Sequence, residues 1–501
     1  MAGLKDGDDF KDGEFFKSPT ALKFLCLLIG GGGTALFLIM ALLWKEKAGE
    51  MGYSWLFAVV FFLSLTVGGL FWTLLHNASN SGWGVVIRRL MENLASMIPF
   101  MLILGLPLVL SFFGFRDKLW EWFPKREDAL TEAVAKAEKS VPEYIQKHEK
   151  QLKAAKAELD AEKAKLAAIA DPSPGHRAHF DRTIASLQGK VDEIASEDMS
   201  TGAVNDRLVE KYYRKANALL AVKEGFLNPT AWNIRYFFYL IVLTAIAWIL
   251  RAWSIKQDSD GSPKWLRLAR RWSCGFLPFF ATAWTFLVID WLMALDYTWF
   301  STMWGVYLFA GCALNSMGLL VITVTLLRRS GYLKNVVTME HYHLMGKLML
   351  AFTIFWAYIA FSQFFLIWYA NITEETKFYL TRNSEFWNVY TITFLVIGHF
   401  FIPFAVLLIQ KVKKLPHILS AVAVWNLVMH VLDIYWIIIP ERGPSLTNGT
   451  EMVMPGAILF DILAFVSVAG LFGFFLLRQL GTASLFPCRD PRLDESLNVV
   501  N

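Results

Sequence analysis

The sequence predicts an all-α, polytopic membrane protein with ten transmembrane helices. Hydrophobic residues make up 55% of its 501 residues and charged residues only 18%, whereas about 25% of the residues in a soluble protein are charged. Ten separate stretches are apolar enough to cross a bilayer core of about 30 Å, which takes about 20 helical residues. Several of them carry an Asp or a His near the middle, where lipid offers no partner. Such residues indicate proton, quinone or ion chemistry.

The predicted spans are joined by short loops, with one long exception after the third span. A tail (1–21) precedes spans one to three (22–113), an insertion (114–233) precedes spans four to ten (234–477), and a second tail (478–501) ends the chain. An even number of spans places both termini on one side of the membrane. The predicted spans are 22–44, 53–75, 94–113, 234–253, 276–296, 302–327, 346–369, 388–410, 418–439 and 455–477.

Positive charge predicts the orientation. Lys and Arg, such as Arg88 and Arg89, are concentrated in the short loops after spans 2, 4, 6 and 8 and are sparser in those after spans 1, 5, 7 and 9. Because cytoplasmic loops carry the excess of Lys and Arg, both termini are expected in the cytoplasm.

The insertion 114–233 is hydrophilic and carries heptad spacing. Ile145, Leu152, Leu159 and Leu166 recur every seven residues, and a second apolar series runs from Phe180 to Ile194. The segment 171–175, with two prolines and a glycine, separates them. These patterns predict two amphipathic helices folded back as an antiparallel coiled hairpin outside the membrane. It serves either as a solvated spacer or as a binding surface for a neighbouring subunit.

A faint internal repeat suggests how the spans are grouped. Tyr53-Ser54-Trp55-Leu56 begins span 2, and Tyr297-Thr298-Trp299-Phe300 precedes span 6. Four spans separate these motifs. The repeat predicts two four-helix bundles, spans 2–5 and 6–9, flanked by spans 1 and 10.

The polar residues of span 9 are the most informative candidates for a site. Asn426, His430 and Asp433 stand at i, i+4 and i+7, so they share one helical face. Asp290 in span 5 and Asp461 in span 10 are expected at a depth similar to that of Asp433, in the outer half of the membrane.

His399 in span 8 is expected near the midplane, at the level of His430. Imidazoles and desolvated carboxylates relay protons near neutral pH, so Asp290, His399, His430, Asp433 and Asp461 predict a proton path that opens to the outside. Each acid alone is also explained by a static hydrogen bond to a neighbouring helix. Tyr358 and Gln363 in span 7 are candidates to extend the path, as is Asn426.

Three other chemistries stay open. A His or carboxylate in this set could accept a proton from a quinol, and His399 with His430 could ligate a haem. A secondary transporter would use broken helices, for which Gly30–Gly33, Pro99 and Pro107 are candidate breaks. The four cysteines are far apart, so we expect no iron–sulfur cluster and no metal site in this chain.

Two stretches resemble a known family. They are KLMLAFTIFWAYIAFSQFFLIWYANITEET (347–376) and GYSWLFAVVFFLSLTVGGLFWTLLHNASNSGWGVVIRR (52–89). Both resemble the F subunit of bacterial alternative complex III, which is similar to the NrfD-like membrane anchors of polysulfide and nitrite reductases. The resemblance covers most of the chain outside 114–233.

The resemblance implies a subunit of a multisubunit quinol:electron acceptor oxidoreductase in the bacterial inner membrane. The expected partners are a multihaem cytochrome c, an iron–sulfur protein and a sister NrfD-like subunit, with lipid around them and no nucleic acid. Haem c and iron–sulfur clusters are then expected on those partners, because this chain has no C-x-x-C-H motif. In the family, quinol oxidation is assigned more readily to the sister subunit. The chain is therefore expected to provide a proton path or a scaffold and no catalytic residue. Direct quinol binding and a transporter acting alone are the alternatives.

Overall fold

The computed structural model describes residues 5–169, 171, 173–442 and 455–500, and these residues form helices and no β-strand. Ten of the helical segments are long and apolar enough to cross a membrane. The predicted all-α polytopic membrane fold is therefore confirmed. The spans are Thr20–Leu43, Lys45–Ala78, Val85–Val109, Pro229–Asp260, Pro263–Leu295, Trp304–Arg329, Met339–Ala370, Glu385–Leu408, Pro416–Arg442 and Ala457–Leu480.

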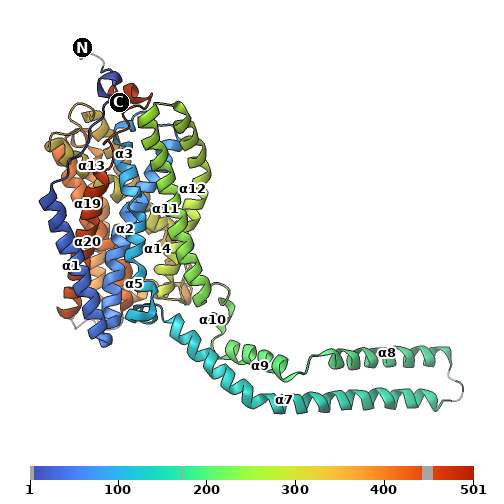
Figure 1. Ribbon diagram of the computed structural model, residues 1–501. Coiled ribbons are helices and arrows are strands. Elements are labelled where there is room, and N and C mark those ends of the chain that lie inside the picture. Colours follow the sequence, from blue (N-terminus) through green and yellow to red (C-terminus); the bar gives the residue numbers. More distant parts are fainter. Residues whose placement is uncertain (1–4, 170, 172, 443–454, 501) are drawn as a thin grey trace. The chain divides into compact units, whose positions relative to one another are not determined.

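The chain divides into two compact units. One contains Met1–Glu121 and Thr230–Asn501 and holds all ten spans; the other is Trp122–Pro229. Figure 1 shows the helices of both units. The main helices of the spanning unit are α1 (Thr20–Leu43), α2 (Ala48–Ala78), α3 (Val85–Ala95), α11 (Pro229–Asp260), α12 (Pro263–Trp291), α13 (Trp304–Arg329), α14 (Met339–Ala370), α19 (Pro416–Ile438) and α20 (Pro455–Leu480).

The centre of the spanning unit is formed by α2 and α13. Nearly every residue of α2 is buried, and α2 packs against α3, α12, α13, α19 and α20. On its other faces, α13 packs against α14 and α19. The α1 helix packs mainly against α20. These two central helices therefore connect the early and late spans.

Prolines divide the third span. After α3, the chain forms α4 (Ile98–Leu104) and α5 (Leu106–Val109), with Pro99 and Pro107 in their first turns. Proline is tolerated there because its missing N–H would have no partner in the helix. The glycines of α1 do not break that helix. A Cβ on Gly30 would lie only 2.6 Å from the backbone carbon of Gly470 in α20, so this glycine permits close helix packing.

The two terminal tails meet at one end of the spanning unit (Figure 1). The Lys5 amide donates to Asn498 over 2.9 Å, and Asn498 donates back to the Lys5 carbonyl over 2.9 Å. We call this the terminal end and the opposite one the far end. An even number of spans requires this arrangement.

The second unit is built on the long helix α7 (Trp122–Ala167), which packs against α8 (Pro174–Ser196) and α9 (Thr201–Ala216). Leu159 and Val191 lie in a buried cluster, with Leu152, Ile184 and Leu187 packed against it. Towards its N-terminal half, α7 pairs with α9 through Ala137, Val141, Val204 and Leu208. The returning arm was expected to be one helix but consists of two, because the chain is extended at Glu197 and Ser200 caps α9. Pro172 of the predicted break lies outside the described residues.

Candidate functional site: a polar seam between α13 and α19

Polar side chains line the contact between the antiparallel helices α13 and α19. Small residues let the helices approach: His430 packs on Gly311, and Ala423 packs beside Gly318. Positions three or four apart share one face of a helix, so the polar groups of each helix follow one another along the contact. We call this set the polar seam: Tyr307, Asn315 and Thr325 of α13 with Ser420, Asn426, His430 and Asp433 of α19.

Asp433 lies at the far end of the seam and is 2% exposed. The Tyr307 hydroxyl donates to one carboxylate oxygen over 2.5 Å, and the Trp356 indole N–H of α14 donates to the other over 3.2 Å. No Lys or Arg of the described chain forms a salt bridge with it; the nearest basic group is His430, whose Nδ1 lies 4.0 Å from Oδ2. Asp433 is therefore a buried acid held by neutral donors.

His430 is the next polar group along α19 and is 1% exposed. Its Nε2 lies 2.9 Å from the hydroxyl oxygen of Ser64 in α2. Its Nδ1 has no hydrogen-bond partner among the described residues and faces Asp433. The imidazole thus connects the central helix α2 with the carboxylate.

His399 reaches the same place from the eighth span. That span runs through α16 (Glu385–Tyr390), the π-helix η5 (Thr391–Phe401) and α17 (Ile402–Leu408). The His399 ring lies 4.0 Å from the Trp356 ring and 6.4 Å from the His430 ring, centroid to centroid. Neither His399 nitrogen has a partner in the described part of the chain. π-Helical turns often occur at functional sites, and here one carries a fully buried, unpartnered imidazole.

The seam continues towards the terminal end. Asn426 has no partner for either amide atom, and the Asn315 carbonyl oxygen has none, within the residues described. Beyond them, Ser420 donates to Thr325 over 2.8 Å, and the Thr325 hydroxyl lies 3.0 Å from that of Tyr342. Buried polar atoms normally have partners, so this run of unsatisfied groups needs an explanation other than packing.

Asp290 lies elsewhere, between α11 and α12. Arg235 donates to both of its oxygens, over 2.8 and 2.7 Å, and the Tyr239 hydroxyl donates over 2.6 Å. A bidentate guanidinium fixes a carboxylate and balances its charge. The prediction had placed Asp290 with Asp433, but this acid belongs to a separate ion pair.

Asp461 of α20 is also ion-paired. Arg442 donates to Asp461, the Ser54 hydroxyl donates to it over 2.6 Å, and the Tyr435 hydroxyl donates over 3.2 Å. Of the five predicted residues, the structure therefore brings together only His399, His430 and Asp433.

The other predicted extensions do not join the seam. Tyr358 is 64% exposed, and its side chain lies on the outside of the helices. Gln363 is buried on α14, where it interacts with Tyr379. Asn426 alone of these three lies on the seam.

Sequence reasoning missed the partners of the acids. Arg235 had a signal, because an arginine inside an apolar span needs a counter-charge and Tyr239 follows at i+4 on the same face. No signal in the sequence marked Tyr307, Trp356 or Ser64. Aromatic residues and serines are common in spans, and a single sequence does not show which helices are in contact.

A buried charge network occupies the terminal end. Arg88 pairs with Glu92 over 3.2 Å and with Asp490 over 2.7 Å, and Arg492 pairs with Asp490 over 2.9 Å. Burial alone would raise the pKa of the Asp490 carboxyl, but the charges of Arg88 and Arg492 outweigh it and lower the pKa to about 2. Arg88, counted above as a loop charge, thus holds the C-terminal tail.

The two histidines do not fit a haem. Trp356 and Phe61 pack on their rings, and Ser64 already contacts Nε2 of His430, so side chains fill the space that a macrocycle would need. Over the residues that the structure describes, no three His, Cys, Asp or Glu side chains group closely enough to hold a metal ion.

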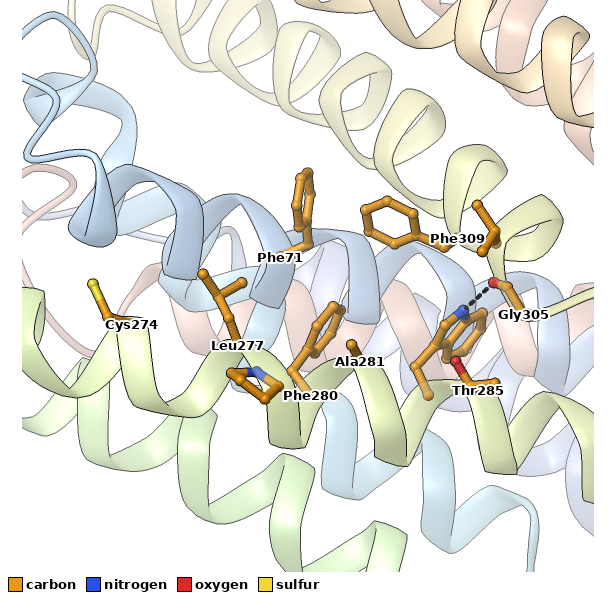
Figure 2. Close-up of a pocket in the computed structure, with 11 residues that line it drawn as sticks. Phe71, Cys274, Leu277, Phe280, Ala281, Thr285, Gly305 and Phe309 are labelled. Carbon is orange, nitrogen blue, oxygen red and sulfur yellow. Dashed lines mark hydrogen bonds between the residues drawn. The ribbon is translucent and has the colours of Figure 1, made fainter. Parts of the chain in front are cut away.

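A cavity of about 440 Å³ lies between α2, α12 and α13. Figure 2 shows Phe71, Phe280 and Phe309 around it, with Thr285 and Cys274 as its polar side chains. Its lining contains no Asp or Glu, no histidine and no seam residue. This cavity suits a hydrocarbon chain and offers nothing for proton chemistry.

Comparisons with known proteins give no family for this chain. No family model matches it, and no curated protein matches it either.

Proposed function

We propose that this chain is a membrane subunit of a respiratory quinol:electron acceptor oxidoreductase and that its polar seam carries protons. The observation that supports the proton path is Asp433: a buried carboxyl held by Tyr307 and Trp356, with an imidazole nearby and no Arg or Lys bound to it among the described residues. An acid locked to an arginine stays ionised, whereas an acid among neutral donors can bind and release a proton.

The relay has three members. Asp433 and His430 exchange a proton, and the 4.0 Å between Oδ2 and Nδ1 is closed by a small ring rotation or one bridging water. His399 is the next acceptor, with both nitrogens available. Asn426 and Asn315 supply the polar lining that lets water extend the path towards Ser420 and the terminal end.

The proposed assembly rests on the family resemblance and on the sequence, which has no C-x-x-C-H motif. Electron transfer requires redox centres, and haem c and iron–sulfur clusters would lie on a multihaem cytochrome c and an iron–sulfur subunit. The terminal end, where both tails meet, would face the cytoplasm of a bacterial inner membrane. A direct role in pumping then requires coupling to quinol oxidation in a sister subunit.

Purification in mild detergent, followed by proton-to-electron measurements in liposomes, tests this proposal. Haem c and iron–sulfur subunits should copurify with the chain. Asp433→Asn and His430→Gln should lower the proton-to-electron ratio of the complex while quinol still binds. Tyr358→Phe, on an exposed tyrosine, is the matched control. An unchanged ratio in both seam variants would exclude the proton path.

A direct quinol site is the second candidate. His399 has two unpartnered nitrogens beside the Trp356 ring, an arrangement that could bind a quinol hydroxyl. Labelling with a photoreactive quinone would favour it if the label attached near His399. Substrate uptake by the chain alone in liposomes would instead indicate a transporter.

A further inference from the structure

Arg382 is inserted into the far end of the spanning unit, just after α15 (Thr373–Thr381). Its side chain is 1% exposed. The guanidinium donates to the carbonyls of Trp436 over 3.0 Å, Ile437 over 2.7 Å and Phe378 over 2.8 Å. It also donates to the Glu441 carboxylate over 3.0 Å.

Two aromatic rings hold the same charge in place. The guanidinium carbon lies 3.5 Å from the Phe378 ring centroid and 5.1 Å from that of Trp436. Two of the carbonyls it binds, those of Trp436 and Ile437, belong to the last turn of α19, where the helix dipole favours a cation. Arg382 is therefore a fixed positive charge that is held from several sides.

This charge lies directly beyond Asp433. Ile437, whose carbonyl binds Arg382, is one helical turn after Asp433 in α19, a rise of about 6 Å. Tyr307, the partner of Asp433, interacts electrostatically with Arg382. A proton leaving Asp433 along α19 towards the far end would meet the guanidinium.

We propose that Arg382 is a cationic barrier that closes the far end of the polar seam to protons. The proposal rests on the proton path proposed above. Fixed positive groups exclude protons and cations from narrow pathways, and a guanidinium keeps its charge at any physiological pH. The sequence predicted a path opening at this end; with Arg382 in place, protons reach Asp433 from the Ser420 side of the seam.

Proton leak through the full-length chain tests the barrier. The purified protein is reconstituted in liposomes that contain a pH-sensitive dye, and a potassium diffusion potential with valinomycin drives proton entry. The rates of proton entry for wild type and Arg382→Lys should agree within about twofold. Arg382→Gln should leak about tenfold faster, because the charge is gone while a polar side chain remains. Arg382→Gln combined with Asp433→Asn should return to the wild-type rate.

Two further variants keep the test decisive. Arg382→Met replaces Arg382→Gln if the latter does not fold, since the unbranched methionine side chain fills the space of the aliphatic part of the arginine. Glu441→Gln leaves the charge and its carbonyl bonds in place and should stay tight. The barrier is ruled out if Arg382→Gln or Arg382→Met leaks protons no faster than wild type. It is also ruled out if the double variant with Asp433→Asn still leaks, or if Glu441→Gln leaks.

The leak result is separable from the proposed function. If Asp433→Asn leaves the proton-to-electron ratio unchanged, the proton path fails, whatever the leak shows. If that ratio falls but Arg382→Gln stays tight, the path stands and the barrier fails.

Discussion

Asp290 and Asp433 are both buried acids on membrane-spanning helices, yet their surroundings differ in one respect. Arg235 binds Asp290 through both carboxylate oxygens, whereas Asp433 receives hydrogen bonds from the neutral groups of Tyr307 and Trp356. The first arrangement stabilises one charge state and fixes two helices together. The second leaves the acid able to change its protonation state.

The comparison extends to the other buried acids. Asp461 with Arg442, and Asp490 with Arg88 and Arg492, belong with Asp290. Asp433 stands apart because its hydrogen-bond donors among the described residues, Tyr307 and Trp356, are neutral. Burial in the membrane therefore does not distinguish these acids, and the proposed relay role of Asp433 rests on the charge of its partners.

The largest effect is expected at Asp290. Asp290→Asn should lower the free energy of unfolding by about 3 kcal/mol, because it leaves the Arg235 charge without its partner. Thermal unfolding in detergent measures it. The double variant Asp290→Leu/Arg235→Met should recover most of the loss, since both charges are gone. If Asp290→Asn is as stable as wild type, the distinction between Asp290 and Asp433 is lost.

A second effect concerns Asp490 and pH. Its pKa is lowered to about 2 in the folded protein, against about 3.9 in an unfolded chain. A lowered pKa stabilises the fold above about pH 4, and this contribution of about 3 kcal/mol is lost as pH falls towards 2. Unfolding of wild type and Asp490→Asn should therefore differ most at pH 6 and converge as the solution is acidified. A difference that is constant with pH would contradict this assignment.

His399→Leu should separate function from stability. Proton translocation by the complex should fall about tenfold, as expected when a relay group is removed. Stability should stay the same or rise by up to about 1 kcal/mol, because the variant removes buried nitrogens that lack partners. If the variant unfolds instead, His399 has a structural role like that of Arg235.

The smallest effect is expected for Tyr307→Phe. Losing one hydrogen bond to Asp433 should cost about 1 kcal/mol and reduce proton translocation a few-fold. Tyr435→Phe is the control, because Asp461 keeps Arg442 and Ser54 when it loses that tyrosine. Equal effects of the two substitutions on translocation would argue against a special role for Asp433.

Several features could be predicted because they depend on local sequence. Apolar length sets the spans, and Pro99 and Pro107 mark where the third one divides. Spacing along one helix placed Asn426, His430 and Asp433 on a common face. The heptads of the insertion predicted which residues pack between α7 and α8, such as Leu159 and Val191, but not the break before α9.

The sequence by itself determined that ten helices cross the membrane and that acids and imidazoles lie inside them. Hydrophobicity and helical periodicity depend only on neighbouring residues. Only the tertiary structure decided which acid meets an arginine, since Arg235 lies 55 residues from Asp290 and Tyr307 lies 126 residues from Asp433. The charge state of a buried acid depends on side chains brought to it by other helices, and that pairing is set by packing.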